Sequence, residues 1–294
     1  MALVNLNGIL KEAREGKYAI PAFDVSTYEM ARAVVDVAQE LKAPVILMGL
    51  KPDLTDDAFD SMSIIMQNIA KKASVDVCIH LDHAGELELI KRAIAQGYSS
   101  VMIDASQKPL EDNIRITREV TDYAHMYGVS VEAELGHVGD GIVGNSETGT
   151  QGESNGHDST LTRAKDMEKF IEETNVDALA VAIGTSHGVY RGTPKLDLDL
   201  MDELNRRSSV PLVMHGGSGT PEKDVVKSIE LGMCKINIFS DILQGYYSGM
   251  KEFLNETENL SVWPSAGNKR AIEYMKRVIR EKYEVFGAVN KNRK

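Results

Sequence analysis

The sequence predicts an α/β protein of the (β/α)8 TIM-barrel class with an additional C-terminal helix. Eight short apolar runs alternate with longer segments of helical period along the chain. Near-continuous apolar runs are typical of parallel strands buried on both faces, and amphipathic segments suit the crossovers between them. The 294 residues exceed the about 250 of a typical barrel, which leaves room for one added element. A doubly wound open sheet is the structural alternative.

The elements can be placed in order along the chain. The predicted strands cover residues 18–25, 44–49, 76–83, 99–106, 129–136, 178–184, 211–217 and 235–241. Between the first two strands, Met30, Ala33, Val34, Val37 and Leu41 form one apolar stripe, as in a helix that packs on a sheet. The Gly- and Ser-rich interval 137–160 predicts a mobile active-site loop, and residues 266–286 predict the additional helix. No linker interrupts this order, so we expect one domain over residues 1–294.

Composition limits the classes of function. The chain has 44 acidic and 33 basic residues, and this acid excess disfavours nucleic-acid binding, which needs clustered Lys and Arg. No run approaches the about 20 apolar residues of a membrane span, and no apolar leader begins the chain. Cys78 and Cys234 lie in apolar stretches without metal spacing, which favours buried thiols in a reducing compartment. We therefore expect a cytoplasmic protein.

Reactive side chains recur at the carboxyl ends of the predicted strands. These ends carry Asp24, Asp82, His83, Asp104, Glu132, Glu134, His187, His215, Asn237 and Asp241. In a barrel these positions surround one mouth, where enzymes of this fold carry their sites. Polar residues are also common at strand ends simply because these ends are exposed to solvent. Solvent exposure alone does not easily explain why acids and imidazoles recur at six successive strands.

Three of these residues are histidines from different strands. His83, His187 and His215 are 104 and 28 positions apart along the chain. Three neutral imidazoles with an open fourth position make a catalytic Zn²⁺ site. A single strand-end histidine is more often structural, and His80, His125, His137 and His157 are interpreted in that way or as solvated.

Two further features adjoin these histidines. Asp82 directly precedes His83, so it either exchanges a proton with bound substrate or orients the histidine. The turn HGGSG at residues 215–219 lets backbone N–H groups approach an anion, and Pro221 suits the start of the next helix. Loops after the seventh and eighth strands often form a phosphate site in such barrels.

These residues, in this order, resemble the class II, zinc-dependent ketose-bisphosphate aldolases, which include the fructose- and tagatose-bisphosphate enzymes. The matching segments are AIPAFDV, HLDH, SVMIDAS, VEAELGHVG, AVAIGTSHGVY, MHGGSG and KINIFSD. The resemblance implies a barrel that cleaves a phosphorylated ketose reversibly to dihydroxyacetone phosphate and an aldehyde. No Schiff-base lysine is then required, and Lys235 is predicted at the amino end of its strand, away from the mouth.

The resemblance also implies roles for individual residues. His83, His187 and His215 would hold Zn²⁺, with Glu134 and Asp104 supporting the metal or forming an alternative position. Asp82 would transfer a proton at the oxygen of the bond made or broken, and Asn237 would also be catalytic. The dihydroxyacetone-phosphate half would be bound by Gly188, Gly216, Gly217, Ser218, Asn237 and Ser240, often with Na⁺ or K⁺ nearby.

Three departures concern the other half of the substrate. Where relatives carry Asn, a hydroxyl residue and Arg against the distal phosphate, this chain has Asp24, Leu50 and Ser265. These changes remove hydrogen-bond donors and add repulsion, so we expect an aldehyde without a phosphate. Lys51, Lys269 or Arg270 would be the cations available to replace the lost one. Of the loop acids, Asp140 is our choice for moving the C3 proton, ahead of Glu147 and Glu153.

Several alternatives stay open from the sequence. They are a fructose- or tagatose-1,6-bisphosphate aldolase proper, a metal-dependent hydrolase on the same barrel, and a barrel without catalysis that serves as a binding partner. The hydrolase is disfavoured because the first strand lacks a His-x-His pair. The expected partner is a small phosphorylated sugar, with no nucleic acid and no membrane, and the resemblance suggests a homodimer or homotetramer.

Overall fold

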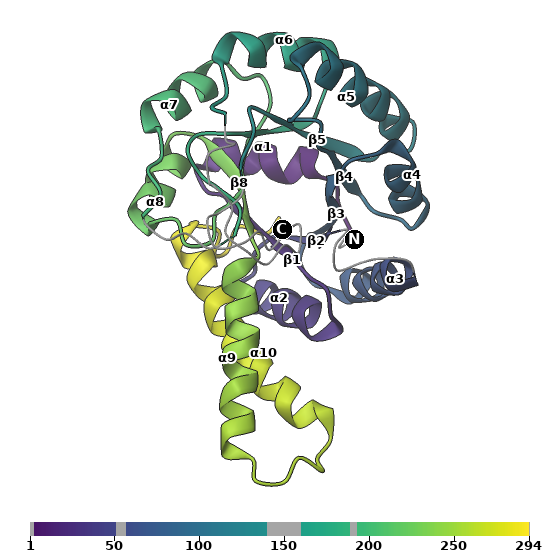
Figure 1. Cartoon of the computed structure of the whole chain (residues 1–294), viewed down its shortest axis with the longest axis vertical. Helices are drawn as coiled ribbons and strands as arrows, with labels where there is room; N and C mark the ends of the chain where they lie inside the picture. Colours follow the sequence, from purple (N-terminus) through teal and green to yellow (C-terminus); the bar gives the residue numbers. More distant parts are fainter. Residues whose placement is uncertain (1–2, 51–56, 140–159, 189–192, 294) are drawn as a thin grey trace.

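Eight parallel strands close into a barrel, as the sequence predicted. The computed structural model describes residues 3–50, 57–139, 160–188 and 193–293. Each strand pairs with the next one along the chain, and β8 closes the ring on β1 (Figure 1). The strands are β1 (Ile20–Asp24), β2 (Val45–Leu50), β3 (Val77–Ala84), β4 (Ser100–Ile103), β5 (Ser130–Leu135), β6 (Ala178–Val181), β7 (Leu212–Met214) and β8 (Met233–Ile238). The doubly wound open sheet is therefore excluded.

Helices surround this ring and connect its strands. They are α1 (Leu6–Gly16), α2 (Tyr28–Glu40), α3 (Asp57–Lys72), α4 (Leu87–Ala95), α5 (Leu110–His125), α6 (Ala164–Thr174), α7 (Leu198–Arg207), α8 (Glu222–Glu230), α9 (Ser240–Glu256) and α10 (Pro264–Val285). The predicted helix at 266–286 corresponds to α10. Within the described residues, no helix combines the length and apolar character that crossing a membrane requires.

The connection from β1 to β2 illustrates why these residues fold as they do. The Thr27 side chain accepts a hydrogen bond from the backbone N–H of Met30 and so caps the start of α2. The predicted apolar stripe of α2 is buried at Met30, Ala33, Val34 and Val37. All six residues of β2 are buried as well, as a strand covered on both faces requires.

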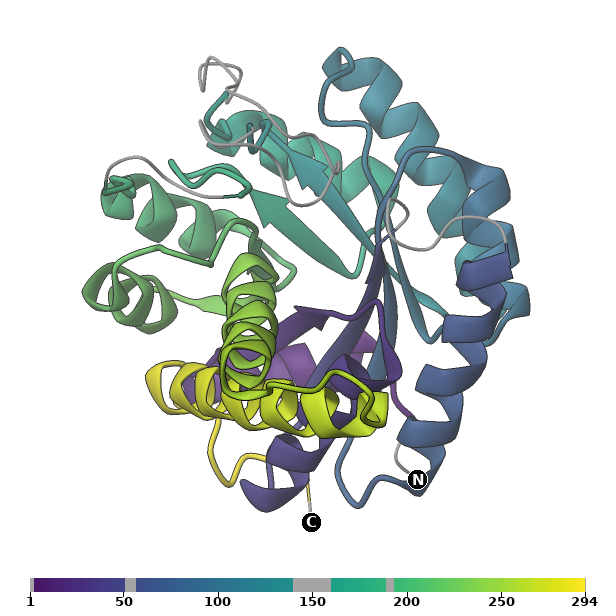
Figure 2. The same cartoon turned by 60° about the horizontal axis from the view of Figure 1, so that its bottom comes forward.

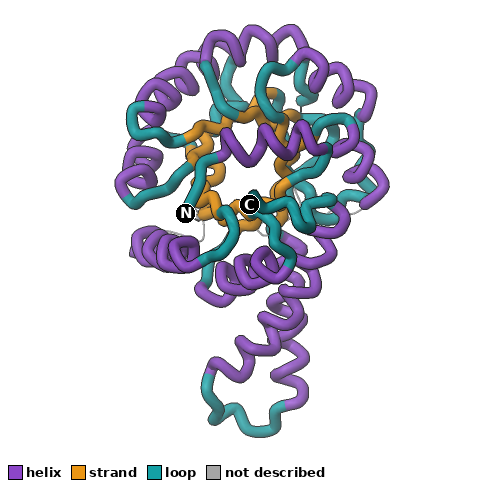
Figure 3. Tube along the Cα trace, turned by 180° about the vertical axis from the view of Figure 1, so that it is seen from behind, coloured by secondary structure: helices purple, strands orange, loops and turns teal. Residues whose placement is uncertain are grey.

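Helix α1 covers the amino-terminal end of the barrel. Seen from behind, it crosses the ring of strands (Figure 3). Its buried residues are Leu6, Ile9, Leu10 and Ala13, and the backbone N–H of Leu6 donates to the Ser130 hydroxyl on β5. Both ends of the described chain lie on this side: Leu3 bridges to Val77 at the start of β3, and the Asn292 side chain accepts from the backbone N–H of Asp76.

The last two helices form an arm that extends away from the barrel. In Figures 1 and 2, α9 and α10 pack against each other, and the part of α10 nearer the barrel lies against α2, where Lys276 pairs with Asp36. Gly249 on α9 allows this close packing, because a Cβ atom there would lie 2.7 Å from the Cα atom of Ala271 on α10. The connection between the helices ends in Trp263, whose exposed fraction is 83%. The arm therefore presents apolar side chains at its outer end.

Most strands are shorter than predicted, and β7 and β8 illustrate why. Strand β7 stops at Met214, before Gly216 takes a left-handed conformation, with φ of 66°. Strand β8 runs from Met233 to Ile238 rather than over 235–241, because Ser240 already begins α9. Asp241 therefore lies in the first turn of that helix, where its carboxylate pairs with Lys282 on α10.

The packing of the arm can be tested by two glycine substitutions on one helix. Gly249→Ala is expected to destabilise the protein by about 1–3 kcal/mol, because the new methyl group overlaps the α10 backbone. Gly245→Ala is the matched control: its Cβ atom would lie 3.3 Å from the nearest atom, and alanine favours a helix by about 1 kcal/mol over glycine. Urea unfolding monitored by circular dichroism measures both, and equal stability of the two variants would contradict the packing described.

Candidate metal centre

Three histidines far apart in sequence meet at the carboxyl end of the barrel. His83 lies at the end of β3, His187 follows β6 and His215 follows β7. The ring centroids lie 4.9 Å apart for His83 and His187, 4.7 Å for His83 and His215, and 5.7 Å for His187 and His215. One nitrogen from each ring lies within 4.8 Å of the others. The predicted ligand set is therefore brought together.

The backbone of β3 bends locally to place His83. Its φ angle is 44°, in the left-handed region that residues other than glycine rarely adopt. The pairing of β3 with β4 shifts register between Leu81 and Ala84. Successive side chains of a regular strand point to opposite faces, whereas an irregularity re-aims one of them. The bend thus allows neighbouring Asp82 and His83 to serve the same site.

Carboxylates orient two of the three imidazoles. Asp104 Oδ2 lies 2.9 Å from His83 Nδ1, and Glu132 Oε1 lies 2.9 Å from His215 Nε2. Burial raises the pKa of Asp104, but the hydrogen bond and charge of His83 outweigh it, so that the pKa lies below its ordinary value. Both remaining nitrogens, His83 Nε2 and His215 Nδ1, face each other at 2.9 Å. Such carboxylate–histidine pairs fix the ligand nitrogen of metal sites.

The described residues fit a divalent metal ion. Nitrogen ligands of tetrahedral zinc, each about 2.0–2.1 Å from the ion, stand roughly 3.3–3.4 Å apart. In this cluster His83 Nε2 and His215 Nδ1 lie 2.9 Å apart, and one nitrogen of each of the three rings lies within 4.8 Å of the others. Glu134 Oε2 is buried, accepts no hydrogen bond from the described residues and lies 3.6 Å from His215 Nδ1. His83, Asp104 and Glu134 form a second convergent set, so both predicted supporting acids adjoin the histidines.

Burial keeps the remaining imidazole neutral. Desolvation lowers the pKa of His187 well below its ordinary value, and the neighbouring His83 and His215 lower it further. A neutral imidazole is the form that binds a metal ion. His187 is therefore ready to bind without first losing a proton at neutral pH.

Asp82 lies buried beside this cluster. Burial alone would raise its pKa, but the electrostatic influence of the neighbouring His83, followed by His215 and Lys235, outweighs burial and lowers the pKa. The Asn237 side-chain amide donates to the carboxylate at 3.3 Å. Asp82 is thus held ionised, as a proton acceptor must be.

Glycine-dependent turns lie near β7 and β8, where the sequence predicts an anion site. A Cβ atom at Gly216 would lie 2.3 Å from the Ser186 carbonyl oxygen, and one at Gly217 would lie 2.4 Å from Ile236. The Ser218 hydroxyl accepts hydrogen bonds from the backbone N–H groups of Phe239 and Asp241. These bonds join the turn to the start of α9, where Ser240 lies. Gly188, with φ of 88°, ends the described segment after β6.

The residues predicted for the aldehyde half do not all meet. Asp24 and Leu50 are buried at the ends of β1 and β2, and Leu50 lies opposite Asp82 in the β2–β3 pairing. Ser265 instead is exposed at the start of α10, at the outer end of the arm (Figure 1). The alternative cations Lys269 and Arg270 are also on the arm, and Arg270 pairs with Glu252 and Glu256.

Part of the prediction lies outside the described residues. Asp140, Glu147 and Glu153 of the loop belong to this part, as do Lys51 and His157. The loop is described only at its ends, where His137 and Thr160 form an antiparallel bridge.

Sequence reasoning missed a charged layer beneath the histidines. Lys235 is buried inside the barrel, and its ammonium lies 3.0 Å and 2.9 Å from the two carboxylate oxygens of Glu132. Placing Lys235 at the strand's amino end was wrong, because β8 begins two residues earlier and the long side chain reaches the centre. The sequence feature that could have revealed this is the spacing of Lys235 and Asn237. Residues two apart in a strand point to the same face, so Lys235 points into the barrel if Asn237 does.

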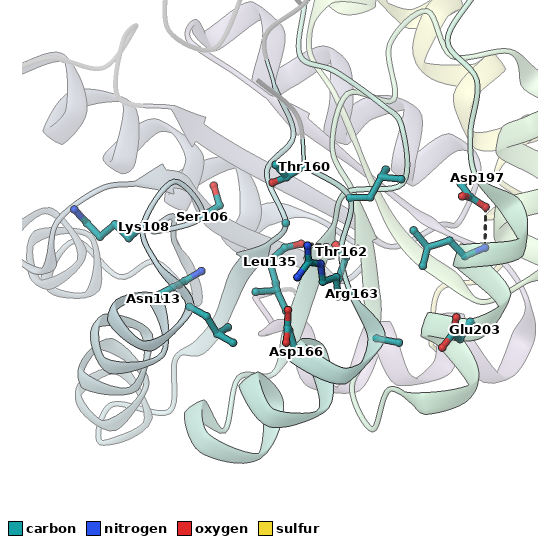
Figure 4. A pocket seen from close by; sticks show the side chains of 15 residues that line it. Ser106, Lys108, Asn113, Leu135, Thr160, Thr162, Arg163, Asp166, Asp197 and Glu203 are labelled. Atoms are coloured by element: carbon teal, nitrogen blue, oxygen red, sulfur yellow. Dashed lines mark hydrogen bonds between the residues drawn. The ribbon is translucent and has the colours of Figure 1, made fainter. Parts of the chain in front are cut away.

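A separate cavity of about 710 Å³ lies beside the barrel and contains none of the three histidines (Figure 4). It is lined mainly by residues around α5, α6 and α7. Its charged side chains have both signs, with Lys108 and Arg163 against Asp166, Asp197 and Glu203. Asp197 also caps α7 by accepting from the backbone N–H of Leu200. No single ligand chemistry is indicated there.

Comparisons with known proteins agree with this geometry. Residues 4–291 match the family described as fructose-bisphosphate aldolase class-II. A 6-phospho-5-dehydro-2-deoxy-D-gluconate aldolase of Halalkalibacterium halodurans is 36% identical over 291 residues, covering 96% of each chain. The crystal structure of the YdjI aldolase from Escherichia coli K12 is 33% identical, with a TM-score of 0.86 over 99% of this chain and 100% of that one. A fructose-bisphosphate aldolase from Campylobacter jejuni, 22% identical, shares the fold, with a TM-score of 0.82 over 99% of this chain and 97% of that one.

The family match spans nearly the whole chain, and the strand-end histidines and acids form groups that could hold a metal ion. Class II aldolases use a divalent metal ion, which distinguishes them from enzymes that form an imine with lysine. The chain belongs to the class II fructose-bisphosphate aldolase family and is a lyase.

Proposed function

We propose that this aldolase uses Zn²⁺ to cleave a phosphorylated ketose, reversibly, into dihydroxyacetone phosphate and an aldehyde without a phosphate. The observation that carries the proposal is the convergence of His83, His187 and His215 beside the buried carboxylate of Asp82. Three neutral imidazoles are a typical catalytic zinc set. The adjoining carboxylate supplies a base within the same pocket.

The dihydroxyacetone-phosphate half binds at the turn after β7 and the start of α9. Gly216 and Gly217 keep the backbone free of side chains, and Ser218 and Ser240 offer hydroxyl groups there. The N-terminus of α9, a helix of 17 residues, adds a partial positive charge that favours an anion. Gly188 borders the same side of the mouth. A monovalent cation near this phosphate stays a prediction.

Bond cleavage requires a proton to leave the hydroxyl group on the carbon that becomes the aldehyde. When bound, Zn²⁺ would polarise the ketone and stabilise the negative charge that develops on the dihydroxyacetone-phosphate fragment. Asp82 accepts the hydroxyl proton in cleavage and returns it in condensation. The carbanion left by cleavage takes up a second proton to become dihydroxyacetone phosphate, and Asp140 stays the predicted donor of that proton. Asn237 orients Asp82 through its amide, and it lies on the strand that leads to the phosphate end.

The aldehyde half lies toward β1 and β2. Leu50 is opposite Asp82 across neighbouring strands, and Asp24 ends the next strand in the ring. A carboxylate and an isobutyl group offer no donor to a dianion, and the carboxylate repels it. The relative from H. halodurans has a named substrate with a single phosphate, next to its ketone. Both points support an aldehyde product without a phosphate rather than a 1,6-bisphosphate substrate.

We also propose that the enzyme is a homodimer or homotetramer that assembles through the arm. Ser265 and Trp263 lie at the outer end of the arm, which Figure 1 places away from the barrel mouth of the same chain. Exposed apolar side chains there include Leu260, Val262 and Trp263. Ser265 would reach an aldehyde only in another copy. A cytoplasmic location stays a prediction.

Removal of the metal ion tests the proposed centre. Treatment with a chelator is expected to abolish turnover, and stoichiometric Zn²⁺ to restore it, because no described lysine is free to form an imine at the cluster. His215→Ala should lose both zinc and activity, since it removes one ligand of three. Zinc content by elemental analysis and a coupled assay measure these effects, and undiminished activity of the stripped enzyme would reject the metal centre.

Asp82 can be separated from the ligands by an isosteric change. Asp82→Asn is expected to retain zinc but to lower kcat roughly 100- to 10,000-fold, because the amide cannot accept the proton. Asp122→Asn, at an exposed acid of α5, is the matched control and should behave as the parent. Near-normal turnover by the Asp82 variant, measured at saturating zinc, would refute its assignment as the proton acceptor.

Paired substrates test the aldehyde half. The enzyme should have a kcat/KM at least about tenfold higher for fructose or tagatose 1-phosphate than for the corresponding 1,6-bisphosphates, because a buried carboxylate faces the distal group. Asp24→Asn should narrow this ratio, whereas Asp199→Asn on the exposed surface of α7 should not. Equal or faster turnover of the bisphosphates by the unmodified enzyme would sink the substrate proposal while leaving aldolase chemistry intact.

A further inference from the structure

A buried ion pair lies directly beneath one of the proposed metal ligands. Glu132 on β5 and Lys235 on β8 are both fully buried inside the barrel. The Lys235 ammonium lies 3.0 Å and 2.9 Å from the two oxygens of Glu132, and one of these oxygens lies 2.9 Å from His215 Nε2. The three side chains therefore form a continuous chain from the barrel interior to the metal centre.

The donors and acceptors of this chain place a proton on Nε2 of His215. A lysine ammonium only donates, and an ionised carboxylate only accepts. Glu132 therefore accepts from Lys235 and also from His215, which must carry its proton on Nε2. In the neutral ring, the form that binds a metal ion, the lone pair of His215 is then on Nδ1, the atom that faces His83 Nε2 at 2.9 Å, so that a cation can be held between the two nitrogens. This is the tautomer that a ligand at the cluster needs.

Lys235 also determines where a metal ion does not bind. His80, Asp82 and Glu132 form a second cluster of potential ligands, whose atoms lie within 4.8 Å of one another. The Lys235 ammonium supplies a positive charge to that cluster through Glu132. Removing one member of a buried ion pair leaves a charge without compensation. The Lys235 ammonium thus already provides the positive charge beside His80, Asp82 and Glu132. A metal ion is therefore expected at the three histidines instead.

We propose that Lys235 is a positioning residue which, through Glu132, fixes the tautomer of His215 and thereby sets the metal affinity of the enzyme. Among the described residues Lys235 pairs with Glu132 and not with any of the three histidines. The inference rests on the proposed metal centre and adds to it a determinant located in the barrel interior. Asp104 performs the corresponding orientation for His83, but it lies at the mouth, and Lys235 does not contact it.

The competing explanation is a purely structural ion pair that only fills the barrel interior. It predicts a loss of stability on substitution, with the metal affinity of the folded protein unchanged. The tautomer of His215 and the dissociation constant of zinc therefore separate the two explanations. Both can be measured without turnover, by ¹⁵N nuclear magnetic resonance of the metal-free protein and by competition with a chromogenic chelator.

The experiment is a double-mutant cycle on the full-length protein. Its variants are Lys235→Met, Glu132→Gln and the combination of the two, all close in shape to the original side chains. Lys235→Met in the parent should weaken zinc binding roughly 10- to 100-fold, the range found for outer-shell partners of metal ligands. In the Glu132→Gln background the same change should cause no further loss, because the acceptor through which Lys235 acts is already absent. The amide offers either its oxygen or its NH₂ to His215, so both tautomers should appear.

A variant elsewhere in the core separates loss of stability from loss of zinc affinity. Thr174→Ala removes a buried hydroxyl group of α6 that donates to Phe170, and it should lower stability without changing zinc affinity or the His215 tautomer. If Lys235→Met does not fold, Glu132→Gln and the neutral double variant still give the comparison. Parental affinity and a single tautomer in the folded variants, or equal losses in both backgrounds, would overturn the inference. Absence of zinc binding by the parent would instead overturn the proposed metal centre.

Discussion

The common direction of the eight strands is the constraint on which the site depends. Because all the strands are parallel and the ring is closed, each carboxyl end reaches the same rim, and His83 meets His215 across 132 positions of sequence. Strand alternation then builds a second layer two residues lower. Glu132 lies below Glu134, His80 below Asp82 and Lys235 below Asn237. A barrel interior that is usually filled by branched apolar side chains here contains charges and an imidazole.

This polar interior imposes requirements that the structure meets locally. A buried charge is costly unless it is paired, and Lys235 with Glu132 meets this need. His80 keeps a neutral ring, because burial, followed by the charge of Lys235, lowers its pKa to about 3, and its Nδ1 contacts the Ser100 hydroxyl. His83 has a left-handed backbone conformation, and its side chain contacts the Asp104 carboxylate, which helps to hold the residue in place. Strain and buried charge are thus concentrated where the chemistry is expected.

The sequence was most informative where a residue's role follows from strand order alone. The barrel, α10 and the meeting of His83, His187 and His215 needed only strand order and the rule that parallel strands end at one rim. How deep a side chain lies inside the barrel was harder to predict. Lys235 contacts Glu132 because its side chain is long and because β8 begins two residues earlier than expected. Ser265 could not be placed because alignment does not reveal that α9 and α10 leave the barrel as an arm. The helix α1 was also missed, although its apolar stripe is visible at Leu6, Ile9, Leu10 and Ala13.

The position of the chain ends has a practical meaning. Leu3 and the segment around Asn292 are joined to the start of β3, on the side that α1 covers and opposite the histidines. Attachments made near either end would project from the floor of the barrel, so immobilisation on a surface or fusion to a second enzyme would leave the mouth open to solvent. Both linkers would also begin close together, which makes a circularly permuted chain with new ends elsewhere geometrically feasible.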